Sequence, residues 1–97
     1  MKAYKHLIKH CLSMGCVVSV WDGEEYQVIK STSYKAIIDA IESVEEAQLK
    51  IRHKDNLFQT IGWALVSAFG LEDDETVVDY TCTPFMNEWS EVYESTI

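Results

Sequence analysis

The sequence predicts an α+β fold, a two-layer sandwich in which about four mostly antiparallel strands carry three helices. Apolar residues recur at the helical period in three segments, strand-like alternation appears between these segments, and turn residues separate the pieces. The predicted order of elements is α-β-β-α-β-β-α. A chain of 97 residues with 47% hydrophobic residues has the size of one domain, which we expect to span residues 1–97.

A helix is expected over about residues 2–13, because apolar side chains there recur at i, i+3, i+4, i+7 and i+8. Lysines and histidines fall on the opposite face, and Gly15 is a typical helix stop. The following segment, CVVSVWDGEEYQVIK, is typical of a β-hairpin. Asp22-Gly23 has the residue types of a type I′ turn between its two strands.

A second helix is expected after the hydroxyl residues 31–33, which are good helix caps, and its apolar stripe runs over residues 34–44. Residues 47–54 alternate strictly, which indicates a half-buried strand with a basic outer face. Residues 57–69 form a long strand that is apolar on both faces, as in a strand inside a sheet. Gly62 within it marks a bulge or a close approach of backbone.

The last part of the chain lacks periodicity over residues 70–83, which we interpret as a loop with a short extended piece at Thr76–Tyr80. Thr83-Pro84 then has the residue types of a helix start, with Thr as the cap and Pro at the first helical position. An apolar stripe from Phe85 to Tyr93 completes a third helix.

Charge is distributed unevenly along the chain. Residues 1–54 hold all eight Lys and Arg and seven acids, a net charge of +1, whereas residues 55–97 hold nine acids and no base, a net charge of −9. Such a surface repels nucleic acid and anionic membranes and attracts basic protein surfaces. We therefore expect no direct binding of nucleic acid or membrane, and a partner protein with a basic surface.

The cysteine count and the apolar runs indicate a cellular compartment. Cys11, Cys16 and Cys82 are an odd number of cysteines without a signal peptide, which favours free thiols in the cytoplasm. The longest uncharged apolar run, Ile61–Leu71, is too short to cross a bilayer. We expect a soluble, cytoplasmic protein.

Catalytic and metal-binding signatures are weak. His6 and His10 share a helical face, but a metal site needs further ligands, so a solvated polar face is the favoured interpretation. A Cys82–His53 pair lacks the orienting group that such catalysis requires. The acidic segment 72–83 lacks the central glycine and the ligand spacing of an EF-hand. We expect no enzymatic activity, no metal and no cofactor.

The candidate partner-binding residues are two tryptophans and a set of acids. Trp21 and Trp63 lie on strand faces that helices need not cover. If the two tryptophans are neighbours on an uncovered face, they form an exposed aromatic patch; if a helix covers them, they belong to the core. The acidic candidates, all in the C-terminal half, are Glu72, Asp73, Asp74, Glu75, Asp79, Glu88 and Glu91.

Two segments, VVSVWDGEEYQVIKSTSYKAIIDAIESVEEAQLKIR and GWALVSAFGLEDDETVVDYT, resemble small acidic accessory proteins of tailed bacteriophages. The resemblance implies expression in the cytoplasm of the host cell. It also implies a role in host takeover, or in blocking a host defence, by binding a host protein. It supplies no catalytic motif.

The preferred hypothesis is a protein that binds and inhibits or redirects a host protein through its acidic C-terminal half, as a monomer or small homo-oligomer. Three alternatives stay open. The chain is a partial DNA mimic that blocks a nucleic-acid-binding host protein, a structural module whose charge only keeps it soluble, or a small hydrolase or nucleotide-handling enzyme.

Overall fold

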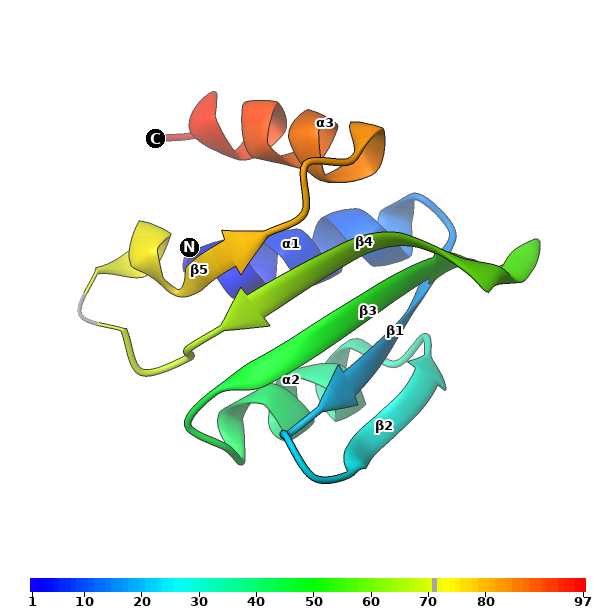
Figure 1. The fold of residues 1–97 in the computed structure, drawn as a ribbon. Helices are drawn as coiled ribbons and strands as arrows, with labels where there is room; N and C mark the ends of the chain where they lie inside the picture. Colours follow the sequence, from blue (N-terminus) through cyan, green and yellow to red (C-terminus); the bar gives the residue numbers. More distant parts are fainter. Residues whose placement is uncertain (71) are drawn as a thin grey trace.

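The computed structural model describes residues 1–70 and 72–97. Within these residues, five antiparallel strands form one sheet in the order β2-β1-β3-β4-β5, and three helices lie on one of its faces (Figure 1). In chain order the elements are α1 (Ala3–Ser13), β1 (Cys16–Trp21), β2 (Tyr26–Ser31), α2 (Tyr34–Glu42), β3 (Ala47–His53), β4 (Asn56–Val66), the 3₁₀ turn η1 (Asp73–Glu75), β5 (Val77–Tyr80) and α3 (Pro84–Glu94). The α+β class and the predicted order of helices and strands are confirmed.

The number of strands differs from the predicted number of about four. The extended piece expected within a loop forms β5, which pairs with the outer side of β4, so that Leu65 lies opposite Asp79. This short strand is the edge of the sheet, and its Val78 side chain is 58% exposed. Val77 and Tyr80 pack against the core, but a register shift lies between them, so the four residues show no regular alternation and the sequence pattern understates the strand.

The predicted helix ends are confirmed by their caps. The hydroxyl of Ser33 accepts a hydrogen bond from the backbone N–H of Ala36, and that of Thr83 accepts one from the N–H of Met86. Gly15 follows α1 with φ +77°, a left-handed conformation that favours glycine.

The first hairpin is confirmed, but its turn is wider than the predicted type I′ turn. Trp21 pairs with Tyr26, which leaves residues 22–25 as the loop. The carboxylate of Asp22 accepts the backbone N–H of Glu25 at 2.8 Å. Among these described loop residues only Gly23 has positive φ, at +103°, whereas a type I′ turn needs positive φ at both central positions.

The core lies between the sheet and the helices, and alternate strand residues supply its sheet side. The alternation predicted for residues 47–54 is confirmed over most of the strand, because Ala47, Leu49 and Ile51 are buried, whereas His53 at its end is only half-buried. Gly62 faces this core, and a Cβ there would lie 2.7 Å from Sδ of Met86. The glycine therefore marks the close approach of α3, and the register shift between the Ile51–Gly62 and Arg52–Thr60 pairs places a bulge beside it, so both interpretations of Gly62 are confirmed.

The polar face of α1 is only partly solvated, contrary to the favoured interpretation of its histidines. Nδ1 of His6 accepts a hydrogen bond from Nε1–H of Trp89 at 3.1 Å, and the ring of His10 lies 5.5 Å from that of Phe85. Helix α3 packs against both β4 and this side of α1. Lys9, on the same face, stays exposed.

Candidate functional site

The helices leave the opposite face of the sheet uncovered (Figure 1). Both candidate tryptophans lie on this uncovered face. The register places Trp21 of β1 opposite Gln48 of β3, and Lys50 of β3 opposite Trp63 of β4. These residues alternate with core residues along each strand, so their side chains point away from the helices. Each tryptophan is half-buried by its neighbours on the sheet rather than by a helix.

Side-chain contacts fix an array on this helix-free face that we call the aromatic strip, made of Trp21, Tyr26, Gln48, Lys50 and Trp63. The rings of Trp21 and Tyr26 meet edge to face at 4.8 Å. Nζ of Lys50 donates to the hydroxyl of Tyr26 at 2.8 Å, and Nε1–H of Trp63 donates to Oε1 of Gln48 at 3.4 Å. Because β3 separates them, the two tryptophans lie about 10 Å or more apart on one face.

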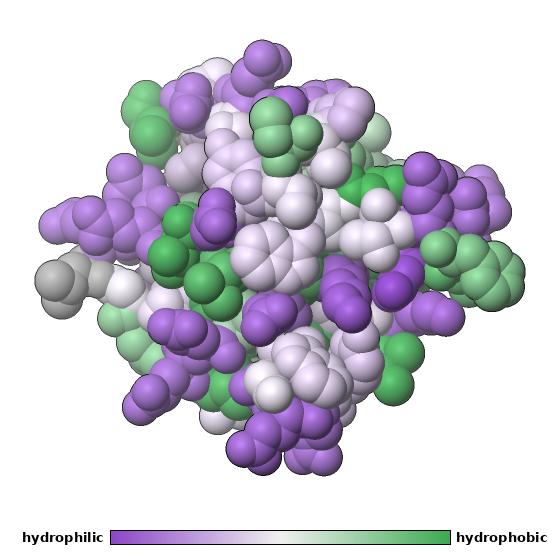
Figure 2. All heavy atoms as spheres, in the orientation of Figure 1, coloured by the Kyte–Doolittle hydropathy of each residue, from purple (hydrophilic) through white to green (hydrophobic). Residues whose placement is uncertain are grey.

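The surface over the central strands is only weakly polar, like the side chains of the aromatic strip. Figure 2, drawn in the same orientation as Figure 1, shows pale, weakly polar side chains across the middle of the helix-free face. Strongly hydrophilic side chains lie among and around them, and hydrophobic side chains adjoin them. Tyr26, Gln48 and Lys50 were not among the predicted site residues. Their signal was nevertheless present: strict alternation placed Gln48 and Lys50 on the outer face, and Tyr26 begins the strand that returns beside Trp21.

The seven predicted acids form an exposed margin that we call the acidic edge, and the structure places them on three elements. Four belong to η1 and the residue before it, Asp79 belongs to β5, and Glu88 and Glu91 belong to α3. Within the described part of the chain, the contacts between acidic and basic side chains are Lys5–Glu42, Lys35–Asp39 and His53–Asp55, so no acid of this edge has a basic partner there. Its charge is therefore uncompensated.

The acidic edge adjoins the aromatic strip at one point. Asp79 lies opposite Leu65 on the helix-free face, and Leu65 is two residues from Trp63 on the same strand. Glu88 and Glu91, by contrast, belong to α3 in the helix layer. Trp63 is thus the tryptophan that the fold brings near the acids, whereas Trp21 lies two strands farther away.

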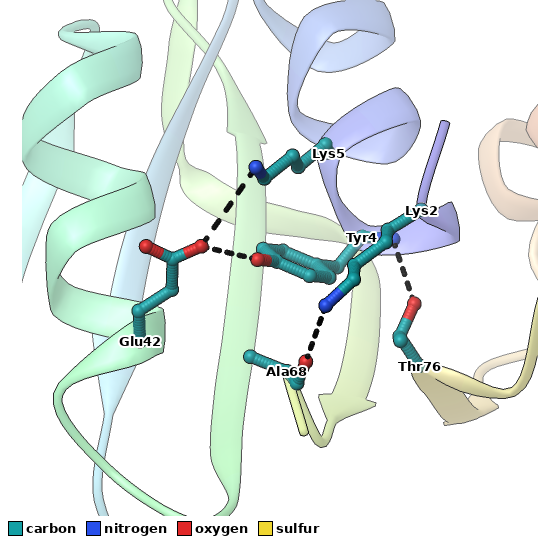
Figure 3. A network of polar contacts seen from close by, with 6 residues as sticks. All are labelled: Lys2, Tyr4, Lys5, Glu42, Ala68 and Thr76. Carbon is teal, nitrogen blue, oxygen red and sulfur yellow. Dashed lines mark hydrogen bonds and ion pairs between the residues drawn. The ribbon is translucent and has the colours of Figure 1, made fainter. Parts of the chain in front are cut away.

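A buried hydroxyl holds the acidic turn η1 against α1 (Figure 3). The side chain of Thr76 is fully buried; its Oγ1 donates to the carbonyl oxygen of Asp73 at 2.9 Å and accepts the N–H of Tyr4 at 3.2 Å. The N-cap residue of α1, Lys2, makes no side-chain capping bond, so Thr76 satisfies a free N–H of the first turn. Nζ of Lys2 instead donates to the carbonyl oxygen of Ala68 at 3.3 Å, just after β4.

The same network continues into α2. The phenol of Tyr4 donates to Oε2 of Glu42, and Nζ of Lys5 lies 4.0 Å from that oxygen (Figure 3). Burial, and then the Glu42 carboxylate, raise the pKa of Tyr4 well above its usual range. The phenol therefore stays a hydrogen-bond donor at every physiological pH. Two helices and the acidic turn are joined through one tyrosine.

The acidic turn also lies beside the end of α3. Glu72, Asp73 and Asp74 line a shallow hollow together with both chain termini and Tyr93. Burial raises the pKa of Tyr93, and the carboxylates of Asp74 and Asp73 add to the effect. The carboxylates of the acidic turn are thus close to Tyr93, which belongs to the core.

The other residues considered for chemistry are separated. Sγ of Cys82 accepts a hydrogen bond from the side chain of Asn87, whereas His53 accepts one from the backbone N–H of Asp55. All three cysteines are free thiols, and burial raises the pKa values of Cys11 and Cys16. Among the described residues, no group of three or more His, Cys, Asp or Glu side chains is arranged to hold a metal ion.

Comparison of the chain with protein-family models, with curated proteins and with solved structures finds no match. The resemblance to phage accessory proteins therefore stays a prediction. None of the helices in residues 1–70 and 72–97 has both the length and the apolar character needed to cross a membrane. What the chain does is inferred from the helix-free face and the acidic edge.

Proposed function

We propose that the chain is a protein-binding protein that docks a partner with a basic surface on its helix-free face, next to the acidic edge. The observation that carries this proposal is the Leu65–Asp79 pair, which makes the aromatic strip and the acidic edge parts of one continuous surface. Tryptophan and tyrosine dominate binding energy at the centre of protein interfaces. Charges at the margin act mainly on the association rate and on specificity.

The contacts on this face support two separate roles, in which apolar side chains anchor a partner and acidic side chains pair with its basic groups. Trp63 and Leu65 are half-buried, so their rings and methyl groups are held in place before a partner arrives, which lowers the entropic cost of binding. The nearby acids have no basic partner among the described residues, so lysines and arginines of another protein can pair with them without breaking existing ion pairs.

We further propose, from the resemblance to phage accessory proteins, that the partner is a host protein that this chain inhibits or redirects. The chain would act by binding and not by catalysis. A nucleic-acid-binding host protein has a basic surface of the required kind. If the acidic edge occupies that surface, the chain acts as a partial mimic of DNA.

The first experiment measures binding of candidate partners that are captured from host lysate, at low and at high salt. One variant neutralises the acids of the η1 region, and a matched control neutralises four exposed acids elsewhere, so that both change the net charge equally. The first variant is Glu72→Gln, Asp73→Asn, Asp74→Asn and Glu75→Gln; the control is Glu24→Gln, Glu25→Gln, Glu45→Gln and Glu46→Gln.

We expect the first variant to associate more slowly and to lose much of its salt dependence, because exposed charges act over about 8 Å at physiological salt. The control should keep most of both. Equal effects of the two variants would show that only net charge matters. A partner that binds both variants with the association rate and salt dependence of the wild type does not support the proposed site.

The second experiment tests the anchor. Trp63→Ser should weaken binding by about 2 kcal/mol or more, chiefly through faster dissociation, whereas Trp21→Ser should have the smaller effect because it lies farther from the acidic edge. Far-UV circular dichroism checks that each variant is folded. Unchanged dissociation of Trp63→Ser would overturn the assignment of the helix-free face.

A further inference from the structure

The β3–β4 hairpin carries a fully exposed aromatic side chain at a break in its pairing. His53 pairs with Asn56, but the next pair is Arg52 with Thr60, so residues 57–59 have no partner on β3. Phe58, at the middle of this bulge, is 100% exposed. β-bulges redirect side chains and are often found at functional positions. Figure 1 shows this end of the hairpin projecting beyond the rest of the sheet.

An apolar hollow lies immediately beside this bulge, between β4 and the start of α3. Its lining residues are Gln59, Thr60, Ile61, Thr83, Pro84 and Phe85. Oγ1 of Thr83 donates to the carbonyl oxygen of Ile61 at 2.7 Å, which fixes the start of the helix to the strand. The hollow therefore lies between two elements that are fixed to each other. Phe58 is not among the residues that line the hollow of its own chain.

The charge pattern favours a second copy of this chain as the occupant. Two copies with a net charge of −8 repel each other over most of their surfaces. Residues 56–70 and 80–87, which include the bulge and the hollow, contain no charged side chain. On the hairpin side this region is bordered by Lys54 and Asp55, whose charges cancel, and on the α3 side by Glu88.

We propose that two copies associate with two-fold symmetry, each placing its Phe58 ring in the hollow of the other. Symmetric interfaces require that a protruding group and its receptor lie close together on one surface, and here they are adjacent in sequence. A phenylalanine buries about 150–250 Å² when it is covered, so the two rings would form the centre of the interface.

Sedimentation velocity of the full chain, from micromolar to near-millimolar concentration, tests this proposal. The wild-type protein should shift from monomer to dimer, and Phe58→Ser should raise the dissociation constant by about 100-fold or more. Phe69→Ser is the matched control, because Phe69 is also exposed, at 66%, but lies beyond the other end of β4. The control should dimerise like the wild type.

A mixing experiment tests the reciprocal contact. Thr60→Arg places a charged side chain at the hollow, so it should abolish the homodimer while leaving Phe58 in place. An equimolar mixture of Thr60→Arg with Phe58→Ser should regain a weak heterodimer, because one intact ring then faces one intact hollow.

Three results would overturn the proposal. They are a wild-type protein that stays monomeric at all concentrations, a Phe58→Ser variant that dimerises normally, and a mixture that shows no heterodimer. A monomeric wild type that loses a captured host protein on Phe58→Ser substitution would instead assign the hairpin to a different partner.

Discussion

Replacement of Thr76 by valine removes one buried hydroxyl and keeps the shape of the side chain. That hydroxyl holds the acidic turn to the core, since it accepts the N–H of Tyr4 and donates to the carbonyl oxygen of Asp73. Thr76 is 0% exposed, so water cannot take the place of the lost group without a rearrangement. We expect the variant to fold but to be substantially less stable than the wild type.

The magnitude follows from the two hydrogen bonds. A buried N–H left without a partner, here that of Tyr4, costs about 1–3 kcal/mol. The carbonyl oxygen of Asp73 belongs to an exposed turn and can be hydrated, so its loss adds at most about 1 kcal/mol. We therefore expect the free energy of unfolding to fall by about 2–3 kcal/mol, which corresponds to a decrease in Tm of about 10–20 °C for a domain of this size.

The assay is denaturant and thermal unfolding followed by far-UV circular dichroism, with Thr76→Ser as the control. Serine keeps the hydroxyl and loses one buried methyl group, which costs about 1 kcal/mol. Valine should therefore be less stable than serine, although it is more hydrophobic. A valine variant that equals or exceeds the serine variant in stability would refute the role assigned to the hydroxyl.

Three further outcomes are expected. Burial lowers the pKa of His6, so the unfolded chain binds a proton more readily than the folded protein does. The free energy of unfolding should therefore fall as the pH decreases through about 6.5. His6→Gln can still accept the hydrogen bond from Trp89, and it should flatten this pH dependence in urea titrations. In thiol labelling of the native protein only exposed Cys82 should react rapidly, and all three cysteines should react after unfolding. Gly62→Val should lower the free energy of unfolding by about 1–3 kcal/mol in thermal melts, and an added Met86→Ala should recover part of the loss by removing the obstructing side chain.

Much of the fold was predictable because its elements are specified locally. Helices α2 and α3 combine an apolar stripe with a hydroxyl cap, Ser33 and Thr83, whose bonds the structure contains. Strand β3 alternates strictly because one of its faces is buried by helices and the other is not. Local chemistry and tertiary burial agree in these segments, so periodicity alone identifies them.

The features that the sequence did not predict depend on contacts between distant segments. Strand β5 gains its structure from pairing with β4, and its four residues are too few and too exposed to show a period. The histidine face of α1 is covered because α3, some 80 residues later, packs against it through Trp89. The capping of α1 by Thr76 has no signal near α1 at all, because the donor and the acceptor are 72 residues apart.

The candidate site was predictable only in part, for a related reason. Acidic residues and tryptophans were recognisable from composition, but the strand order decides which of them are neighbours. The order β2-β1-β3-β4-β5 places β4 beside β5, which joins Trp63 to the acids, and it places β3 between the two tryptophans, which separates them. No pattern within a single segment contains that information.

The way in which the acidic turn is attached separates the requirements of folding from those of recognition. Its anchor uses a backbone carbonyl and the hydroxyl of Thr76, and in the described part of the chain no carboxylate of residues 72–75 takes part in a hydrogen bond or an ion pair. Like charges about 4 Å apart repel by only about 1 kcal/mol in water, less than the anchor supplies. The carboxylates of the turn can therefore change with little effect on the fold. Trp63 and Leu65 cannot, because they also cover the sheet. Substitutions that tune a partner's association rate should accordingly be tolerated in the turn, whereas substitutions of the anchors should affect binding and stability together.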